Sequence, residues 1–416
     1  MSLEPWINWQ FHKTPNYIDP RATFTRATTG STVNRIGAVS NVKSNTSRYK
    51  FSPVSQVCQG LLVEPQRTNL LLQSQELDNI TWTVTSMTVT ANTLSAPNLT
   101  TTADTLTVTG AGGTLAQTVT ITAGNGIAVS MFAKAGASNF LYIKIAGTIS
   151  VECWYNLSTG VTGTNTAGSG TCVFRQKNIE DYGNGWYRCT LIVTTSTETS
   201  YTASFAPAAA DNTAPANGNN IYAWGSQLES SGATTWTTSY IPTTSSSVTR
   251  NADNLSIPVT SSQVPLDRGT MVFEWTEQIY PSWSSSSTGA VMGGIGDTFS
   301  NTLYISQPYS GIYATYISGA TSTPVTFNTC THNVGETHRY AITWQPGRLA
   351  ACVDGGTVSV NSNSNITAFG SIARIAVGFA PFGTTQTTSV SGVAHRSFMY
   401  IPDVVDDTVL QTITRA

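Results

Sequence analysis

Charged residues are scarce in this sequence. Only 10% of its 416 residues are Asp, Glu, Lys or Arg, whereas an ordinary soluble domain has about 25%. Serine, threonine, asparagine and glycine supply the polar groups instead. The net charge is −2, and no stripe of Lys and Arg is present. The chain therefore lacks the basic surface that binds the phosphates of a nucleic acid.

Long apolar runs are also missing. No stretch of 18 or more apolar residues occurs in the chain, so the sequence contains no candidate for a membrane-spanning helix. The first twenty residues, MSLEPWINWQFHKTPNYIDP, lack a basic segment followed by an apolar core. That excludes an ordinary signal peptide and predicts synthesis in a cytosol.

The cysteines and histidines are not spaced as in common metal-binding motifs. The six cysteines form no CxxC pair and the four histidines have no H-x-x-x-H spacing, so we expect no metal site and no cofactor. Cys153, Cys172 and Cys189 lie in strand-like runs and are expected to be buried thiols. Asp297 and Asp354 stand beside glycines, where calcium is one interpretation and hairpin-turn chemistry is the simpler one.

The sequence also lacks residue patterns that are typical of a catalytic site. A sugar-cleaving site needs two carboxylates that face one groove. Glu274 and Glu277 would point to opposite faces of a strand, Glu180 and Asp181 lie in a turn, and the aspartates of 403–407 begin a predicted helix. No GxSxG motif occurs between a strand and a helix. The sequence predicts a protein that is not an enzyme.

From about residue 79 the sequence has a clear period of two. In WYRCTLIVTT (186–195), Cys189, Leu191 and Val193 share one face, and Arg188, Thr190 and Thr194 share the other. Such alternation is typical of a half-buried strand. Similar runs recur to residue 228 and are separated by Gly- and Asn-rich turns. Residues 79–238 are therefore predicted to form an antiparallel sandwich or jelly roll.

A second all-β region is predicted after a Ser- and Thr-rich linker at 239–264. The segment RYAITWQPGRLAACVDGGTVSV (339–360) alternates on both sides of a turn at Pro346-Gly347, with Ile342 and Trp344 facing a core. Near the C-terminus, PDVVDDTVLQTITRA predicts one helix with Asp403 as its N-cap. Residues 265–416 would thus form another sandwich.

Residues 1–78 have no sustained period. Aromatic residues are scattered among Pro, Asn, Thr and Arg, and too little apolar surface is grouped to form an independent core. We expect an extended arm that becomes ordered by packing on something else. At its end, GLLVEPQRTNLLLQS (60–74) places two apolar triplets on either side of Pro65. We predict that Glu64 and Arg67 form a structural collar there, joined by an ion pair.

Several stretches together resemble segments of tailed-bacteriophage virion proteins. These stretches are GLLVEPQRTNLLLQSQELDNITWT, APNLTTTADTL, GNGWYRCTLIVT and YAWGSQLESSGATTWTTSYIPTTSSSVTRNADNLSI. In that group they belong to a carbohydrate-binding-module-like jelly roll of tail fibres, tailspikes or head fibres. The resemblance covers about residues 20–257. Residues 265–416, with RYAITWQPGRLAACVDGG and YIPDVVDDTVLQTIT, look like a concanavalin A-like or laminin-G-like sandwich.

The resemblance implies an all-β virion protein, with two sandwiches in series behind an N-terminal attachment arm at 1–78. The arm would dock onto capsid or tail proteins, and the sandwiches would bind host-surface glycan, in a homo-oligomer expected to be a trimer. A capsid decoration or head-fibre protein without a specific ligand is the alternative, and a tailspike depolymerase is a third. The chain departs from the group at Pro65, where an acidic residue is usual, and residues 1–20 lie outside the resemblance.

Sugar binding needs an exposed aromatic ring with amides and hydroxyls around it. Trp283, in PSWSSSSTG, and Tyr309, in SQPYSG, lie among turn-forming residues and are the candidate sugar-binding residues. The alternative for both is packing onto the edge of a sandwich or between subunits. Trp236, just before the linker, is expected to pack at a domain junction.

Overall fold

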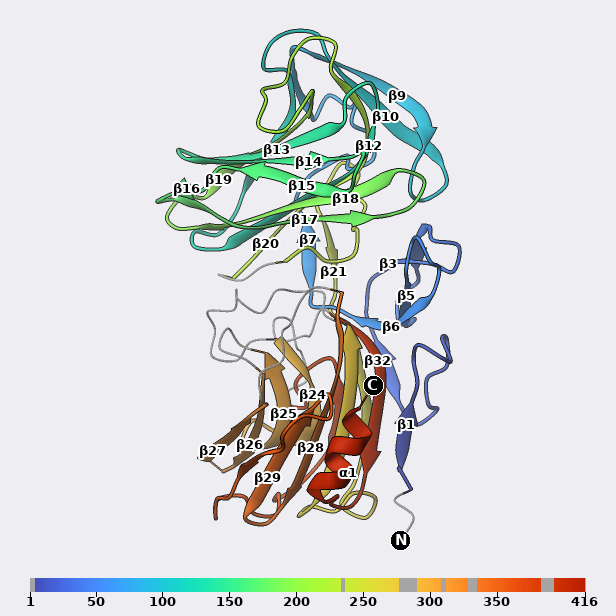
Figure 1. The fold of residues 1–416 in the computed structure, drawn as a ribbon, viewed down its shortest axis with the longest axis vertical. Coiled ribbons are helices and arrows are strands. Elements are labelled where there is room, and N and C mark those ends of the chain that lie inside the picture. Colours follow the sequence, from blue (N-terminus) through green and yellow to red (C-terminus); the bar gives the residue numbers. More distant parts are fainter. Residues whose placement is uncertain are drawn as a thin grey trace.

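The structure consists of two β-sandwiches stacked along the long axis of the molecule (Figure 1). It is a computed structural model that describes residues 4–232, 236–276, 290–307, 312–319, 321–327, 335–382 and 393–415. Nearly all regular structure in these ranges is antiparallel β-sheet. The predicted all-β sandwich fold is confirmed. No helix in these ranges is long and apolar enough to span a membrane.

The first sandwich is made of two sheets from the middle of the chain. Sheet I has the order β16 (Gly168–Ser169), β17 (Cys172–Asp181), β18 (Trp186–Thr195), β12 (Gly126–Ala135), β20 (Asn220–Ser231), β10 (Thr101–Val108) and β9 (Met87–Ser95). Sheet II has the order β15 (Val161–Asn165), β14 (Ser150–Asn156), β13 (Phe140–Ala146), β19 (Ser200–Ala208), β11 (Thr114–Thr120) and β8 (Thr83–Thr85).

The second sandwich is built in the same way. Sheet III has the order β30 (Ser359–Asn361), β29 (Arg348–Val353), β28 (Thr337–Gln345), β23 (Gly269–Thr276), β32 (Val393–Ile401), β6 (Cys58–Val63) and β5 (Arg48–Phe51), and β1 (Ile7–Trp9) also pairs with β32. Sheet IV has the order β2 (Thr23–Thr25), β22 (Asn254–Pro258), β31 (Arg374–Val377), β24 (Ala290–Thr298), β25 (Asn301–Gln307), β26 (Tyr313–Ser318) and β27 (Thr321–Thr326). The strands β3 (Gly30–Val33) and β4 (Val39–Val42) form a separate hairpin.

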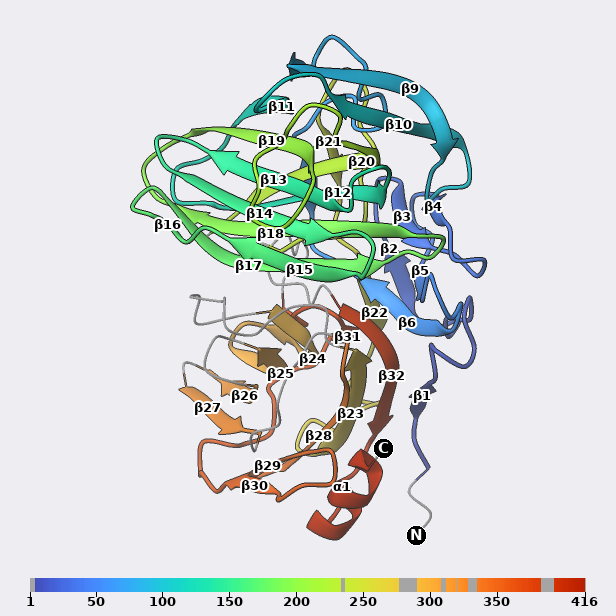
Figure 2. The same cartoon turned by 45° about the horizontal axis from the view of Figure 1, so that its top comes forward.

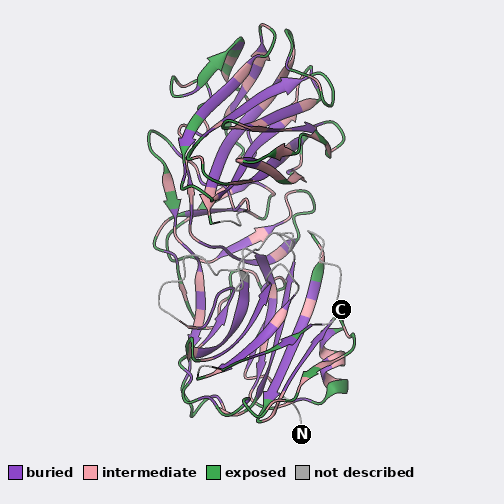
Figure 3. Cartoon of the chain, turned by 90° about the vertical axis from the view of Figure 1, so that its left-hand side faces the viewer, coloured by how far each residue is buried: buried purple, intermediate pink, exposed green. Residues whose placement is uncertain are grey.

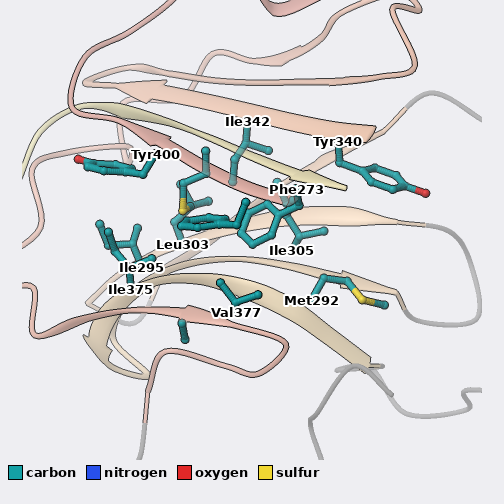
Figure 4. Packing of buried hydrophobic residues seen from close by; sticks show 14 of the residues in the cluster. Phe273, Met292, Ile295, Leu303, Ile305, Tyr340, Ile342, Ile375, Val377 and Tyr400 are labelled. Carbon is teal, nitrogen blue, oxygen red and sulfur yellow. The ribbon is translucent and has the colours of Figure 1, made fainter. Parts of the chain in front are cut away.

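Each sandwich encloses its own apolar core, as the buried inner strands of Figure 3 show. The predicted alternation of β18 is confirmed, because Cys189, Leu191 and Val193 are fully buried in the core of the first sandwich. Phe273 and Ile342 of sheet III meet Ile305 of sheet IV in the second core (Figure 4). The three cysteines predicted as buried thiols are buried and free.

The N-terminal segment is part of the second sandwich and does not form a separate arm. Strands β1, β5 and β6 lie in sheet III, and β2 pairs with β22 in sheet IV (Figure 2). Trp9, Phe11 and Phe51 lie in the core between these sheets. The predicted arm at 1–78 is corrected accordingly. Strands of three to six residues are too short to show a period in the sequence, which is why the pattern was missed.

The first sandwich is consequently an insertion in the second. The chain begins in the second sandwich, builds the first, and returns to the second through the region predicted as a linker. That region contains β21 (Val248–Arg250) and β22, so part of it is sheet. The two sandwiches are nested in the sequence and do not simply follow one another.

The C-terminal helix begins later than the sequence predicted. α1 spans Asp407–Thr414, and its N-cap is Asp406, whose side chain accepts a hydrogen bond from the Val409 amide. Asp403 instead accepts a hydrogen bond from the next backbone amide, that of Val404. Leu410 packs with Ala350 and Cys352 on the outer face of sheet III.

A core substitution tests whether the N-terminal segment is integral to the second sandwich. Leu61→Ala removes a fully buried side chain from β6 and is expected to lower the free energy of unfolding by about 2–5 kcal/mol. The matched control is Val57→Ala, because Val57 is 62% exposed, and its effect should stay within about 0.5 kcal/mol. Urea denaturation measures both. Equal, small effects would indicate a loosely attached arm.

Candidate functional site

The stretch GLLVEPQRTNLLLQS carries the chain from one sandwich to the other. Leu61 and Val63 are buried in the second core, whereas Leu71 is buried in the first. Between them, β7 (Arg67–Asn69) pairs antiparallel with β21 on the return path, and Figure 1 shows the two strands side by side between the sandwiches. We call residues 64–70 and 236–253 the joint. The two apolar triplets on either side of Pro65 thus belong to different cores.

Five buried charged residues hold the joint together. Arg48 and Arg250 each place a guanidinium nitrogen 2.8 Å from Glu64 Oε2. Asp253 pairs with Arg26 at 2.9 Å and also with Arg48. The arginine side chains are at most 1% exposed. We call these five residues the ion cluster. It connects the outgoing path, the return path and the N-terminal strands.

Backbone groups complete the ion cluster. The Glu64 amide donates to Asp253 Oδ2 at 2.9 Å, and the Asp253 amide donates to the Glu64 carbonyl at 2.9 Å. Arg26 donates further to the carbonyls of Thr28, Thr46 and Lys43. A buried ion pair stabilises a fold only when such additional hydrogen bonds offset the loss of water. The carboxylates of Glu64 and Asp253 both lie within this network of ion pairs and hydrogen bonds.

The electrostatics of Glu64 follow from these contacts. Burial by itself would raise the pKa of Glu64, but Arg250 and Arg48, with hydrogen bonds from Ser239, lower it to about 2. The amide and hydroxyl of Ser239 donate to the two carboxylate oxygens at 2.7 and 2.6 Å. Glu64 is therefore ionised at neutral pH and fixed in position.

Arg67 has a different partner from the one predicted. Glu64 pairs with Arg48 and Arg250, while the Arg67 guanidinium lies over the ring of Trp236, 4.8 Å from its centroid. Burial lowers the pKa of Arg67 to about 10, although Glu229 opposes this change. Both predicted collar residues lie in the joint. The expected ion pair between them is corrected, because two arginines distant in the sequence pair with Glu64 and the indole ring of Trp236 packs against Arg67.

Side chains of β20 and β7 hold the return path against sheet I. The Glu229 carboxylate accepts a hydrogen bond from the Thr238 amide at 2.8 Å, and Gln227 accepts one from the Ile241 amide at 2.6 Å. Asn69 donates to the Ile241 carbonyl at 2.8 Å. Side chains of β20 and β7 thus bind the backbone of the return path at Thr238 and Ile241.

A cavity of about 360 Å³ lies at the joint. One wall is the outer face of sheet I, where Asn178 of β17 faces Thr190 of β18, and Gln176 faces Ile192. The other walls come from β3, from β6 and from residues 236–240. On the core side of sheet I, the Tyr155 hydroxyl donates a hydrogen bond to the Thr190 carbonyl at 2.7 Å and holds the backbone of β18 in place. Both sandwiches therefore contribute to the cavity.

The charged residues that line the cavity are bound to protein groups. Lys50 and Glu180 form an ion pair at 3.1 Å. Arg188 donates to the Thr238 carbonyl at 2.8 Å and to Ser130, and it lies over the ring of Phe132. Glu64 belongs to the ion cluster. The charged side chains of the cavity wall thus connect sheet I to β5 and to the return path.

Neutral polar groups of the cavity wall retain hydrogen-bonding capacity. Within the described ranges, Gln59 Oε1, Trp236 Nε1 and Thr237 Oγ1 are buried without a hydrogen-bond partner. The half-buried amides of Gln176 and Asn178 likewise have no partner in that part of the chain. Buried polar groups are normally bonded, so these groups suit a polar ligand.

The sequence-predicted sugar-binding residues cannot be placed at this site. Trp283 and Tyr309 lie outside the described residues. Trp236 lies at the junction of the sandwiches, as expected, and it also lines the cavity. Gln176 and Asn178 were missed. The alternating polar residues of QKNIED indicate an outward strand face, but the segment that covers this face lies sixty residues further along the chain and cannot be inferred from the strand itself.

Within the described residues, no group of three or more His, Cys, Asp and Glu is arranged to hold a metal ion. Asp297 accepts a hydrogen bond from Ser371, and Asp354 accepts one from the Arg339 amide at 2.9 Å. Asp354 also has a positive φ of 49°, as expected for a hairpin turn.

Comparison with known proteins finds similarity to solved structures only. No protein-family model matches the chain, and no curated protein matches it. The CBM40 of Ruminococcus gnavus IT-sialidase, bound to α2,3 sialyllactose, is 12% identical, with 36% of this chain and 84% of that chain covered and a TM-score of 0.29.

Two longer chains have similarly low sequence identities and TM-scores. The mouse laminin α1 chain, domains LG4-5, is 11% identical, with 83% of this chain and 92% of that chain covered and a TM-score of 0.25. Trypanosoma rangeli sialidase is 9% identical, with 75% of this chain and 60% of that chain covered and a TM-score of 0.29. Similarity at this level concerns the β-sandwich fold alone.

Acid titration tests the role of the ion cluster. A carboxylate whose pKa is lowered by folding stabilises the fold above its ordinary pKa, and this contribution is lost as the pH falls through the folded value. For Glu64, with an ordinary pKa of 4.5 and a folded pKa of about 2, the contribution is roughly 3 kcal/mol. We expect the free energy of unfolding to fall between pH 4.5 and 2.

The variant Glu64→Gln should remove most of this pH dependence. It should also cost about 3–5 kcal/mol at pH 7, because two buried arginines lose a counter-charge. Glu152→Gln is the control, since Glu152 pairs with Lys144 at 3.0 Å on a partly exposed face and should contribute below about 1 kcal/mol. Urea denaturation across pH measures all three proteins. An unchanged pH profile for Glu64→Gln would show that Glu64 is not the source of the acid sensitivity.

Proposed function

We propose that this protein is a non-enzymatic glycan-binding protein of a tailed-phage virion, and that the cavity at the joint is its binding site. The observation that carries the proposal is the set of unbonded amide, hydroxyl and indole groups at Gln59, Gln176, Asn178, Thr237 and Trp236. Sugar sites combine such groups with aromatic side chains. Tyr182 and Tyr240 provide further aromatic surface in the same cavity.

The state of the carboxylates supports binding without catalysis. A glycosidase needs a general acid whose pKa is raised and a second carboxylate that faces the same bond. Glu64 lines the cavity, but its pKa is lowered to about 2. Glu180 also lines the cavity and is paired with Lys50. Neither carboxylate has the environment of a general acid.

The composition supports display on a particle. A surface of serine, threonine and asparagine with 10% charged residues resembles that of virion proteins, and the sequence motifs of the joint are those shared with tailed-phage fibres. Weak affinity at one site would be multiplied by many copies on one particle. Docking to capsid or tail proteins and a trimeric state remain predictions from that resemblance.

A glycan array probed with the full-length protein, followed by calorimetry on the best ligand, tests the proposal. Thr190→Val removes one hydroxyl without changing the shape of the side chain, and Asn178→Ala removes one amide. Each should raise the Kd about 5- to 10-fold, as expected for the loss of one hydrogen bond. Asn41→Ala is the matched control, because Asn41 is exposed on β4, outside the cavity.

Two results would contradict this assignment. Absence of any glycan binding would favour the alternative of a capsid decoration or head-fibre protein without a ligand. Binding that persists in Thr190→Val and Asn178→Ala but is lost in Trp283→Ala would move the site to the loops that the sequence predicted.

A further inference from the structure

We infer that the cavity at the joint selects a neutral, hydroxyl-rich saccharide of one or two rings and discriminates against acidic glycans. This inference rests on the proposed glycan-binding function and specifies its ligand class. Three properties of the cavity wall lead to it: the balance of its charges, the chemistry of its unbonded groups, and its volume.

The charges of the wall cancel and are already in use. Two cationic residues, Lys50 and Arg188, and two anionic residues, Glu64 and Glu180, line the cavity. Lys50 is paired with Glu180 at 3.1 Å, and Arg188 donates to the Thr238 carbonyl at 2.8 Å. A ligand carboxylate would have to compete with these contacts for a cationic partner. A carboxylate that failed to gain one would lose its hydration in a partly buried site, which is costly.

A further effect works against an anion. The two glutamates are fixed by the fold, Glu64 through Arg48, Arg250 and Ser239. Glu64 is ionised over the physiological range because its pKa is about 2. Both glutamates of the wall are already paired, Glu64 with Arg48 and Arg250 and Glu180 with Lys50. Those cations are therefore occupied by protein carboxylates, and a neutral glycan needs no counter-ion from the wall.

The groups left for a ligand are neutral. Carboxamides such as those of Gln176 and Asn178 both donate and accept, and so does the hydroxyl of Thr237, whereas the Trp236 indole only donates. Sugar hydroxyls also donate and accept, so a ring with adjacent hydroxyls matches this set in either amide orientation. Gln59 and Thr237, whose buried oxygens have no hydrogen-bond partner within the described residues, belong to the same cavity wall.

The size of the cavity limits the ligand. Its volume of about 360 Å³ lies near the lower end of the range of about 300–1,000 Å³ for ligand sites. One or two sugar rings fill such a space.

Paired neutral and acidic ligands test the inference on the full-length protein. The array should contain neutral glycans together with sialylated and uronic-acid derivatives of the same cores, for example lactose and sialyllactose. We expect binding of at least one neutral glycan and at least 10-fold weaker binding of its acidic derivative. The Kd for the neutral glycan should change by less than about twofold between 50 and 500 mM NaCl, because no ion pair with the ligand is screened.

The isosteric variant Asn178→Asp provides a second readout. A carboxylate still accepts hydrogen bonds from sugar hydroxyls, so the neutral ligand should lose less affinity than it loses in Asn178→Ala. An acidic ligand in contact with this position would lose at least as much in Asn178→Asp as in Asn178→Ala, through repulsion.

The outcomes separate this inference from the proposed function. Acidic glycans that bind more tightly than neutral ones, with binding weakened by salt and by Thr190→Val, would overturn the neutral class and leave glycan binding at the joint intact. Binding of neither kind to the wild-type protein would overturn the proposed function and this inference together.

Discussion

The pairing of two carboxylates with three arginines at the joint is the interaction on which the rest of the structure depends. Glu64 lies where the chain leaves the second sandwich, and Asp253 lies where it returns. Arg48 contacts both carboxylates, so it fixes the distance between the two crossings. Removal of such buried charges from water is costly, and only the complete set of partners makes the arrangement favourable. The ion cluster is therefore stable in one geometry of the joint.

This geometry of the joint fixes the position of the inserted first sandwich relative to the second. The first sandwich is connected to the second by two crossings, and two flexible connections would leave it free to pivot. The β7–β21 pair, the ion cluster and the contacts of Glu229 and Gln227 with the return path hold the crossings against sheet I. The cavity exists because of this restraint, since its walls belong to different parts of the chain. A ligand bound in this cavity would meet walls that are already fixed in position, which reduces the entropy lost on binding.

The sequence predicted those features that depend on local pattern. Alternation in WYRCTLIVTT identified the inner and outer faces of β18, whose Cys189, Leu191 and Val193 lie in the first core. Features that depend on distant partners were not predictable. The partners of Glu64 lie sixteen residues before it and 186 residues after it, and no spacing rule connects them. Strands as short as β1 and β2 have no period, so their place in the second sandwich follows only from tertiary pairing.

We expect the ion cluster to couple the two sandwiches into one cooperative unit. Differential scanning calorimetry of the wild-type protein and of Asp253→Asn tests this coupling most directly, because Asp253 bridges Arg26 and Arg48. The wild type should show one transition, and the variant should show two separated transitions, the lower one well below the wild-type melting temperature. Two independent transitions in the wild type, or a single unshifted transition in Asp253→Asn, would contradict it.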